Sequence, residues 1–202
     1  MVAKPVKLQP LIDKIGEHKA LRSCAPVCFY VVLLAAGYLP EGLDIATFVE
    51  DLDDKSLFAD VVNHHDWSRP ALSRYLRTKY KAGIVSWQLG WPPPNDLERM
   101  HNSGYIDSPV EERFLQQVVE KHTLEQLVRD GFPVIVTVNS FGDVERTNVH
   151  AIVLVRWTDE EVLVIDPDIR NSQTTVTPEY LLAHITPTGG ASVVLPPNYA
   201  LK

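Results

Sequence analysis

The sequence predicts an α+β fold in which an N-terminal helical part with a central buried helix packs on a C-terminal antiparallel β-sheet. Three observations lead to this expectation. Residues 8–80 read as helical, residues 134–165 carry short apolar runs separated by polar turns, and no stretch between them reads as a linker. The chain has 202 residues, enough for one sizeable core, so we expect a single domain over residues 1–202.

The central helix is expected over Cys24–Gly37, a stretch that is apolar nearly all round and is therefore buried. Ser23 can cap its start, and Pro26 suits the first helical turn, where its missing N–H costs nothing. Gly37 is a typical C-terminal stop. Further helices over residues 43–52 and 70–80 are expected on the surface of this core.

The middle of the chain is mixed. Residues 84–89 favour a short strand, whereas residues 90–94 contain three consecutive prolines and must be irregular. Residues 109–130 have apolar residues at helical spacing, with a break expected near Thr123.

The C-terminal part reads as a sheet. Compact apolar runs at residues 134–138, 150–157 and 162–165 predict an antiparallel meander, with a polar turn at Thr158–Glu161. A short helix over residues 177–184 and a last strand over residues 191–195 complete the expected elements.

Composition excludes several functional classes. The net charge is −7 and the basic residues are scattered, so we expect no nucleic-acid partner, because a phosphate backbone needs clustered cations. Residues 1–20 lack the apolar core of a signal peptide, and the apolar run 27–36 is too short to cross a bilayer. The two cysteines lie one helical turn apart, where a bridge is disfavoured. We therefore expect a reduced, cytoplasmic protein without a membrane partner.

Cys24 is a candidate nucleophile. A thiol reacts strongly only as a thiolate, and the positive end of a helix and a nearby protonated histidine both lower its pKa. Cys24 opens the most buried predicted helix. The unpaired N–H groups of that helix start could also stabilise an oxyanion forming on a substrate carbonyl.

His150 and Asp166 are the candidate base and orienting group. His150 begins one apolar strand and Asp166 follows the next, so the two are expected to be neighbours at one end of a hairpin. They face each other directly if the connecting loop has an odd number of residues centred on Thr158. An even loop without a bulge would place them on opposite faces.

The ordered set of these motifs resembles the papain-like cysteine peptidases, nearest to the peptidases that process bacteriocin leaders after a double glycine and to their stand-alone relatives. Three stretches carry the resemblance, which spans most of residues 23–196: Ser23-Cys-Ala-Pro-Val-Cys28, Gly131-Phe-Pro-Val-Ile-Val136, and Asn148-Val-His-Ala-Ile-Val-Leu-Val155 with Val162-Leu-Val-Ile-Asp-Pro167. The resemblance implies a papain-like fold, a Cys24–His150–Asp166 triad, an acyl-enzyme, a peptide or protein substrate, and neither cofactor nor metal.

The chain departs from the family pattern at three positions. Ala25 replaces the glycine that usually follows the nucleophile, and Val149 replaces the glycine that often precedes the histidine. His18 stands six residues before Cys24, where the family has an oxyanion-donating glutamine, which makes His18 the oxyanion candidate. The candidates for substrate binding are Ala25, Trp87, Trp91, Asn139 and Val149.

Two alternatives to hydrolysis remain open on the same fold. An acyltransferase or transpeptidase would use the same acyl-enzyme with a different acceptor, and a peptide-binding module would have lost activity, for which the His18 substitution is the main argument. A structural or toxin-associated interaction domain that uses the acidic surface is a third, weaker reading. The oligomeric state is not predicted.

Several other features have plain structural explanations. Cys28 is expected to pack as a small apolar residue. His64-His65-Asp66 is expected to be a solvated loop, because adjacent histidines on a helix diverge and no spaced partner follows. Trp87, Trp91 and residues 92–94 either wall a substrate groove or simply pack. Thr188-Gly-Gly190 is explained by a tight turn before the last strand.

Overall fold

The computed structural model describes residues 24–53, 69–88, 122–139, 150–167, 173–186 and 190–195. Within these ranges a six-stranded sheet has the order β1-β6-β2-β3-β4-β5, and every neighbouring pair is antiparallel. Its strands are β1 (Ile84–Gln88), β2 (Val134–Val138), β3 (His150–Trp157), β4 (Val162–Ile165), β5 (Gln173–Val176) and β6 (Gly190–Val194). The described helices are α3 (Cys24–Ala36), α4 (Ile45–Asp53), α5 (Arg69–Tyr80), α8 (His122–Arg129) and α9 (Pro178–His184).

The central helix α3 forms where the sequence predicts it. All nine residues from Ala25 to Leu33 are buried. Gly37 ends the helix with a φ of 77°, and the chain closes with hydrogen bonds from the N–H of Tyr38 to the carbonyl of Leu33 (3.0 Å) and from Gly37 to Leu34 (3.1 Å). This pair of bonds is the Schellman arrangement that favours glycine after a helix. The prediction of a buried helix with a glycine stop is confirmed.

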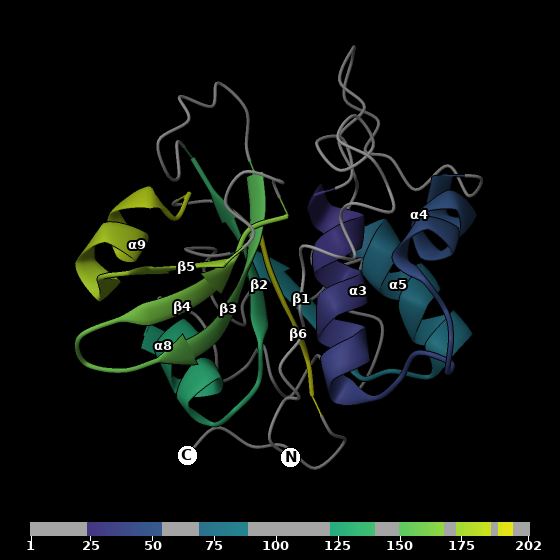
Figure 1. The fold of residues 1–202 in the computed structure, drawn as a ribbon, viewed down its shortest axis with the longest axis horizontal. Helices are drawn as coiled ribbons and strands as arrows, with labels where there is room; N and C mark the ends of the chain where they lie inside the picture. The colour runs from purple at the N-terminus through teal and green to yellow at the C-terminus, as the bar shows by residue number, and fades with distance from the viewer. Residues whose placement is uncertain are drawn as a thin grey trace, which may run out of the picture.

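Helices cover both faces of the sheet (Figure 1). On one face α3 packs on β2, β3 and β6, α4 packs on α3, and α5 packs on β1. On the other face α8 packs on β2 and β3, and Leu181 of α9 joins the same core. The sheet is therefore covered on both faces. All five residues of β2 are buried, which explains why apolar and polar residues do not alternate along this strand.

Successive residues of a strand belong to two hydrophobic cores, one on each face of the sheet. Ala151, Val153 and Ile165 pack with α3, α4 and α5, whereas Ile152 and Val164 pack with α8 and α9. This alternation is the period of two that an extended strand imposes. The α+β class and the predicted packing of a buried helix on an antiparallel sheet are confirmed.

The sheet is more than the predicted meander. The strands β2, β3 and β4 follow one another as expected, but β6 lies between β1 and β2, so the last strand joins the two parts of the sheet. The edge strand β5 was not predicted, because Gln173–Val176 has too few apolar residues to stand out. For the predicted helix over residues 109–130, the structure describes α8, and residues 109–121 lie outside the described ranges.

The hairpin β3–β4 corrects the predicted register. Trp157 pairs with Val162, so the loop has four residues rather than an odd number, and it closes through a hydrogen bond from the Thr158 N–H to the Glu161 carbonyl (2.8 Å). Val155 then bulges out of the ladder, and beyond it Val153 pairs with Ile165. The extra residue at the bulge offsets the even loop and returns the two strand ends to a common face.

Candidate active site

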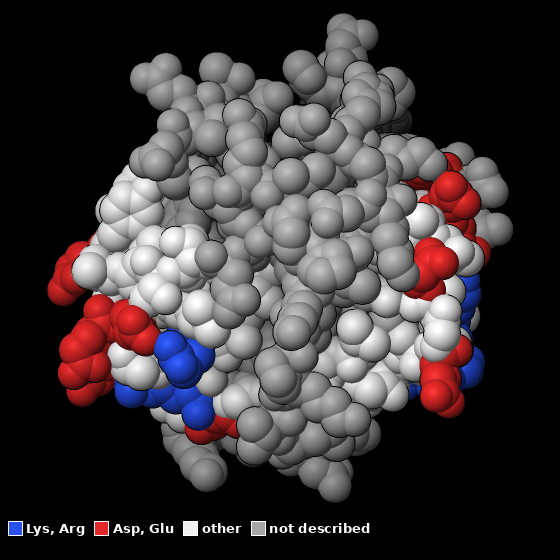
Figure 2. Space-filling view, viewed as in Figure 1, with Lys and Arg blue, Asp and Glu red and all other residues white. Residues whose placement is uncertain are grey.

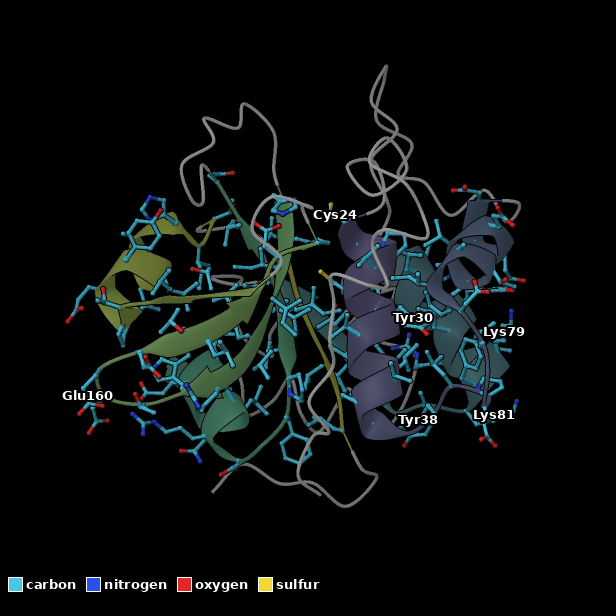
Figure 3. All side chains as sticks on the ribbon, in the orientation of Figure 1. Cys24, Tyr30, Tyr38, Lys79, Lys81 and Glu160 are labelled. Carbon is cyan, nitrogen blue, oxygen red and sulfur yellow. The ribbon has the colours of Figure 1, made fainter. Side chains whose placement is uncertain are left out.

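Cys24 lies at the first residue of α3, at the end of the helix that stands beside the sheet (Figure 3). Its side chain is partly buried, and neither Cys24 nor Cys28 forms a disulfide. The helix begins there, so its first N–H groups have no partner within the helix. The N–H of Ala25 is one of these groups, and it hydrogen-bonds the Cys24 sulfur.

His150 and Asp166 meet at the same end of the sheet. His150 is the first residue of β3 and pairs with Val138 of β2. Its Nε2 atom lies 2.6 Å from Oδ1 of Asp166, and the side chains are only 8% and 2% exposed. The two residues are not directly opposite, as the odd loop would require. The register beyond Val155 places Asp166 opposite Ile152, one position along the same face from His150.

The imidazole also hydrogen-bonds Cys24, so one ring connects the thiol and the carboxylate. Because Nε2 bonds to Asp166, Nδ1 is the nitrogen left for Cys24. The Nε2 proton then points at a carboxylate that can only accept, which fixes the tautomer. The structure therefore brings together the three residues that the sequence selected from distant parts of the chain.

Opposing effects set the ionisation of this group. Burial on its own raises the pKa of the Cys24 thiol, but the hydrogen bond and positive charge of His150 and the N–H groups of Ala151 and Ala25 lower the pKa below its ordinary value. Burial on its own lowers the pKa of His150, but its bonds to Asp166 and Cys24 raise that pKa to about 9. Both shifts favour the form of the pair in which a thiolate lies beside an imidazolium.

The remaining predicted residues fall in different places. Ala25 is buried and contributes its N–H to the sulfur. Asn139 is exposed at the end of β2, and its N–H donates to the carbonyl of His184 (2.9 Å). Trp87 lies on the edge strand β1, where it pairs with Ala191 of β6. The strand β1 is three places from β3 in the sheet order. The candidates His18, Trp91 and Val149, together with the loop His64-His65-Asp66, lie outside the described residues.

Two contacts at the site were not predicted. The N–H of Ala151 bonds the Cys24 sulfur, and the thiol of Cys28 donates to the Ala151 carbonyl at 3.4 Å. The sequence did contain a signal, because Cys28 follows Cys24 by one helical turn and Ala151 is the small residue next to His150. Small side chains at such a point allow a helix and a strand to approach closely.

Charged side chains of the described residues gather at the left and right sides of the face shown in Figure 2. At the tip of the β3–β4 hairpin, where Figure 3 labels Glu160, acidic residues pair with arginines: Arg129 with Asp159 at 2.5 Å and Arg156 with Glu161 at 2.6 Å. Among the described residues, no three His, Cys, Asp or Glu side chains are grouped so as to hold a metal ion. No helix in the described part of the chain is long and apolar enough to cross a bilayer.

Comparisons with known proteins find likenesses among solved structures, two of which follow. No protein-family model matches the chain, and no curated protein matches it. The chain is similar to the crystal structure of the peptidase domain of Streptococcus ComA, a bifunctional ABC transporter involved in a quorum-sensing pathway, at 15% identity and a TM-score of 0.46, covering 87% of this chain and 93% of that one.

The second is the crystal structure of a putative C39-like peptidase from Bacillus anthracis, at 17% identity and a TM-score of 0.48, covering 87% of this chain and 90% of that one. The first of these neighbours is a peptidase domain, and the second is a C39-like peptidase.

Proposed function

We propose that this protein is a cysteine peptidase-like hydrolase that cleaves peptide amide bonds, with Cys24 as nucleophile, His150 as acid and base, and Asp166 as the group that orients His150. One observation carries the proposal: a continuous hydrogen-bonded chain from the Cys24 sulfur through the His150 ring to the Asp166 carboxylate. A buried polar chain of this kind joins a nucleophile to a base and the base to a third group, which is the pattern that nucleophilic catalysis needs.

In the proposed reaction, the Cys24 thiolate attacks the carbonyl carbon of a peptide bond and forms a tetrahedral intermediate. The helix-start N–H groups of α3 stabilise the negative oxygen. The C–N bond then breaks, the His150 imidazolium gives its proton to the departing amine, and an acyl-enzyme remains. His150 next takes a proton from water, whose oxygen attacks the thioester. The carbon–sulfur bond breaks, the carboxylic acid product is released, and the thiolate and imidazolium are restored.

Asp166 supports both half-reactions without changing its own protonation. Its Oδ1 atom accepts the Nε2 hydrogen bond and keeps the ring in one tautomer. It also stabilises the positive charge that His150 carries before it protonates the amine and after it takes a proton from water. The thiolate is itself the nucleophile, so the proposed chemistry uses no metal or cofactor. Two cysteines without a disulfide also suit a reducing compartment such as the cytoplasm.

Selective alkylation tests the proposal. Iodoacetamide at neutral pH, with the products mapped by mass spectrometry, should modify Cys24 much faster than a free thiol and should leave the buried Cys28 unmodified. His150→Ala should slow the reaction at Cys24. Alkylation no faster than that of a free thiol, together with no effect of His150→Ala, would contradict the assignment.

Turnover separates hydrolysis from its alternatives. A fluorogenic peptide library should be cleaved by the native chain and not by Cys24→Ala. If an acyl-enzyme forms but is released faster by added amines than by water, the protein is an acyltransferase. If peptides bind equally well to the native chain and to Cys24→Ala without turnover, it is a binding module.

A further inference from the structure

Cys24 and Cys28 both hydrogen-bond the same residue of β3. The N–H of Ala151 donates to the Cys24 sulfur, and the Cys28 thiol donates to the Ala151 carbonyl at 3.4 Å. In an extended strand the N–H and C=O of one residue point to the same side. Two sulfurs one helical turn apart therefore hold both backbone groups of the residue that follows His150.

From this arrangement, and on the basis of the proposed function, we infer that Cys28 is a positioning residue for the Cys24–His150 pair. By binding the Ala151 carbonyl, Cys28 fixes the start of β3 against the start of α3. That contact keeps the Ala151 N–H on the Cys24 sulfur and holds the His150 ring, one residue away, within reach of the same sulfur.

The packing of the molecule supports this role. Cys28 is 1% exposed and lies in the core between α3 and the sheet, so its thiol is shielded from competing water. The helix α3 packs on β3 more extensively than on any other described strand, and Ala151 is itself buried at this contact. A purely apolar residue of similar size would fill the space but could not donate to the carbonyl.

Three variants in the full chain separate donation from packing. Cys28→Ser keeps a donor, Cys28→Ala removes both donor and volume, and Cys28→Val fills the space without a donor. The measurement is the pH dependence of Cys24 alkylation by iodoacetamide, read at the Cys24 peptide by mass spectrometry, with thermal unfolding recorded for each variant. Ser86→Ala is the matched control, because it removes a buried hydroxyl that bonds Ser73 and Ser192.

We expect the titration midpoint of Cys24 to move up by about 0.5–1 pH unit in both Cys28→Ala and Cys28→Val, and to stay near the native value in Cys28→Ser and in the Ser86→Ala control. Midpoints unchanged in the alanine and valine variants would overturn the inference and leave Cys28 as a packing residue, and so would an equal shift in all three Cys28 variants. Either result leaves the proposed function standing if native Cys24 still titrates low and depends on His150. If native Cys24 titrates like a free thiol, both proposals fail together.

Discussion

The Nε2 atom of His150 lies 2.6 Å from the Oδ1 atom of Asp166, although the two residues are diagonal rather than opposite in the β3–β4 ladder. Diagonal neighbours on one face have Cα atoms roughly 7–8 Å apart, a gap that an imidazole and a carboxylate can bridge. The contact depends on the bulge at Val155, which brings the ends of the two strands to a common face across a four-residue loop.

Removing the carboxylate should disable the base while leaving the nucleophile in place. In Asp166→Ala, His150 loses its orienting partner and the charge that raises its pKa, so we expect kcat/KM for peptide hydrolysis to fall about 100-fold or more. Asp166→Asn keeps an oxygen that can accept the Nε2 proton and should retain much more activity. Equal activity in the alanine variant and the native protein would show that Asp166 does not orient the base.

The rate of hydrolysis should depend on pH with two limbs. Thiolate forms as the pH rises through the lowered pKa of Cys24, and the proton needed by the leaving amine is lost as the pH passes the His150 pKa of about 9. Steady-state kinetics across this range should therefore give a bell-shaped profile of kcat/KM.

His150→Ala provides the complementary check. This substitution removes the hydrogen bond and the charge that lower the pKa of Cys24, whereas burial still raises that pKa. The pH midpoint of Cys24 alkylation should therefore move above that of a free thiol. A midpoint that stays low in this variant would mean that another group stabilises the thiolate.

The stability of the folded protein should respond to pH in a way that identifies the ion pair. His150 has a folded pKa raised from its ordinary value of 6.5 to about 9, so its contribution is complete below pH 6.5 and is lost as the pH rises through about 9. Cys24 has a lowered folded pKa, so its contribution is present above the ordinary thiol value of 9.0 and is lost as the pH falls through the lowered pKa.

Where both shifts act, the folded state gains one proton on His150 and loses one from Cys24 relative to the unfolded chain, and the two slopes cancel. The native protein should therefore show a nearly flat free energy of unfolding over the pH range where both shifts act, from the ordinary His150 pKa of 6.5 or the lowered Cys24 pKa, whichever is higher, up to about pH 9. Cys24→Ala removes one half of the exchange, so its stability should fall with rising pH by up to about 1.4 kcal/mol per pH unit. Urea denaturation at a series of pH values measures both slopes, and parallel curves would exclude the ion pair.

Gly83 should not tolerate a side chain. A Cβ atom at this position would lie 2.2 Å from the carbonyl oxygen of Leu195, whose N–H donates to the Gly83 carbonyl at 2.8 Å. Gly83→Ala must therefore move the β1–β6 contact, and we expect a loss of about 1–3 kcal/mol in the free energy of unfolding. Glu160→Ala, at an exposed turn position, is the control and should stay within about 0.5 kcal/mol of the native protein.

The helices and most strands could be predicted because local signals agree with the tertiary packing. The stretch Cys24–Ala36 is apolar throughout and is followed by a glycine, and Thr177 accepts a hydrogen bond from the N–H of Tyr180 as an N-cap should. The strand Gln173–Val176 was missed because an edge strand needs little apolar surface. The position of β6 between β1 and β2 is a long-range pairing, for which no local pattern exists.

The site was predictable in its residues but not in its detailed geometry. Cys24 begins a predicted helix, His150 begins a predicted strand, and Asp166 directly follows the next predicted strand. The start of one strand of a hairpin lies beside the end of the other, which made His150 and Asp166 predictable neighbours. The bulge at Val155 has no glycine or other turn residue to reveal it, so the register was wrong. Cys28 was assigned to packing because its partner is a backbone carbonyl 123 residues away, which sequence periodicity does not report.

The place of β6 in the sheet also sets the order in which the protein can be built on the ribosome. β1 and β2 have no direct pairing, and the helix that carries the thiol rests partly on β6. β1 is connected to the rest of the sheet only through β6, so its pairing waits until Gly190–Val194 has been synthesised, whereas α3 can pack on β2 and β3 without that strand. We therefore expect the β1 edge of the sheet to be completed only after this strand has been synthesised.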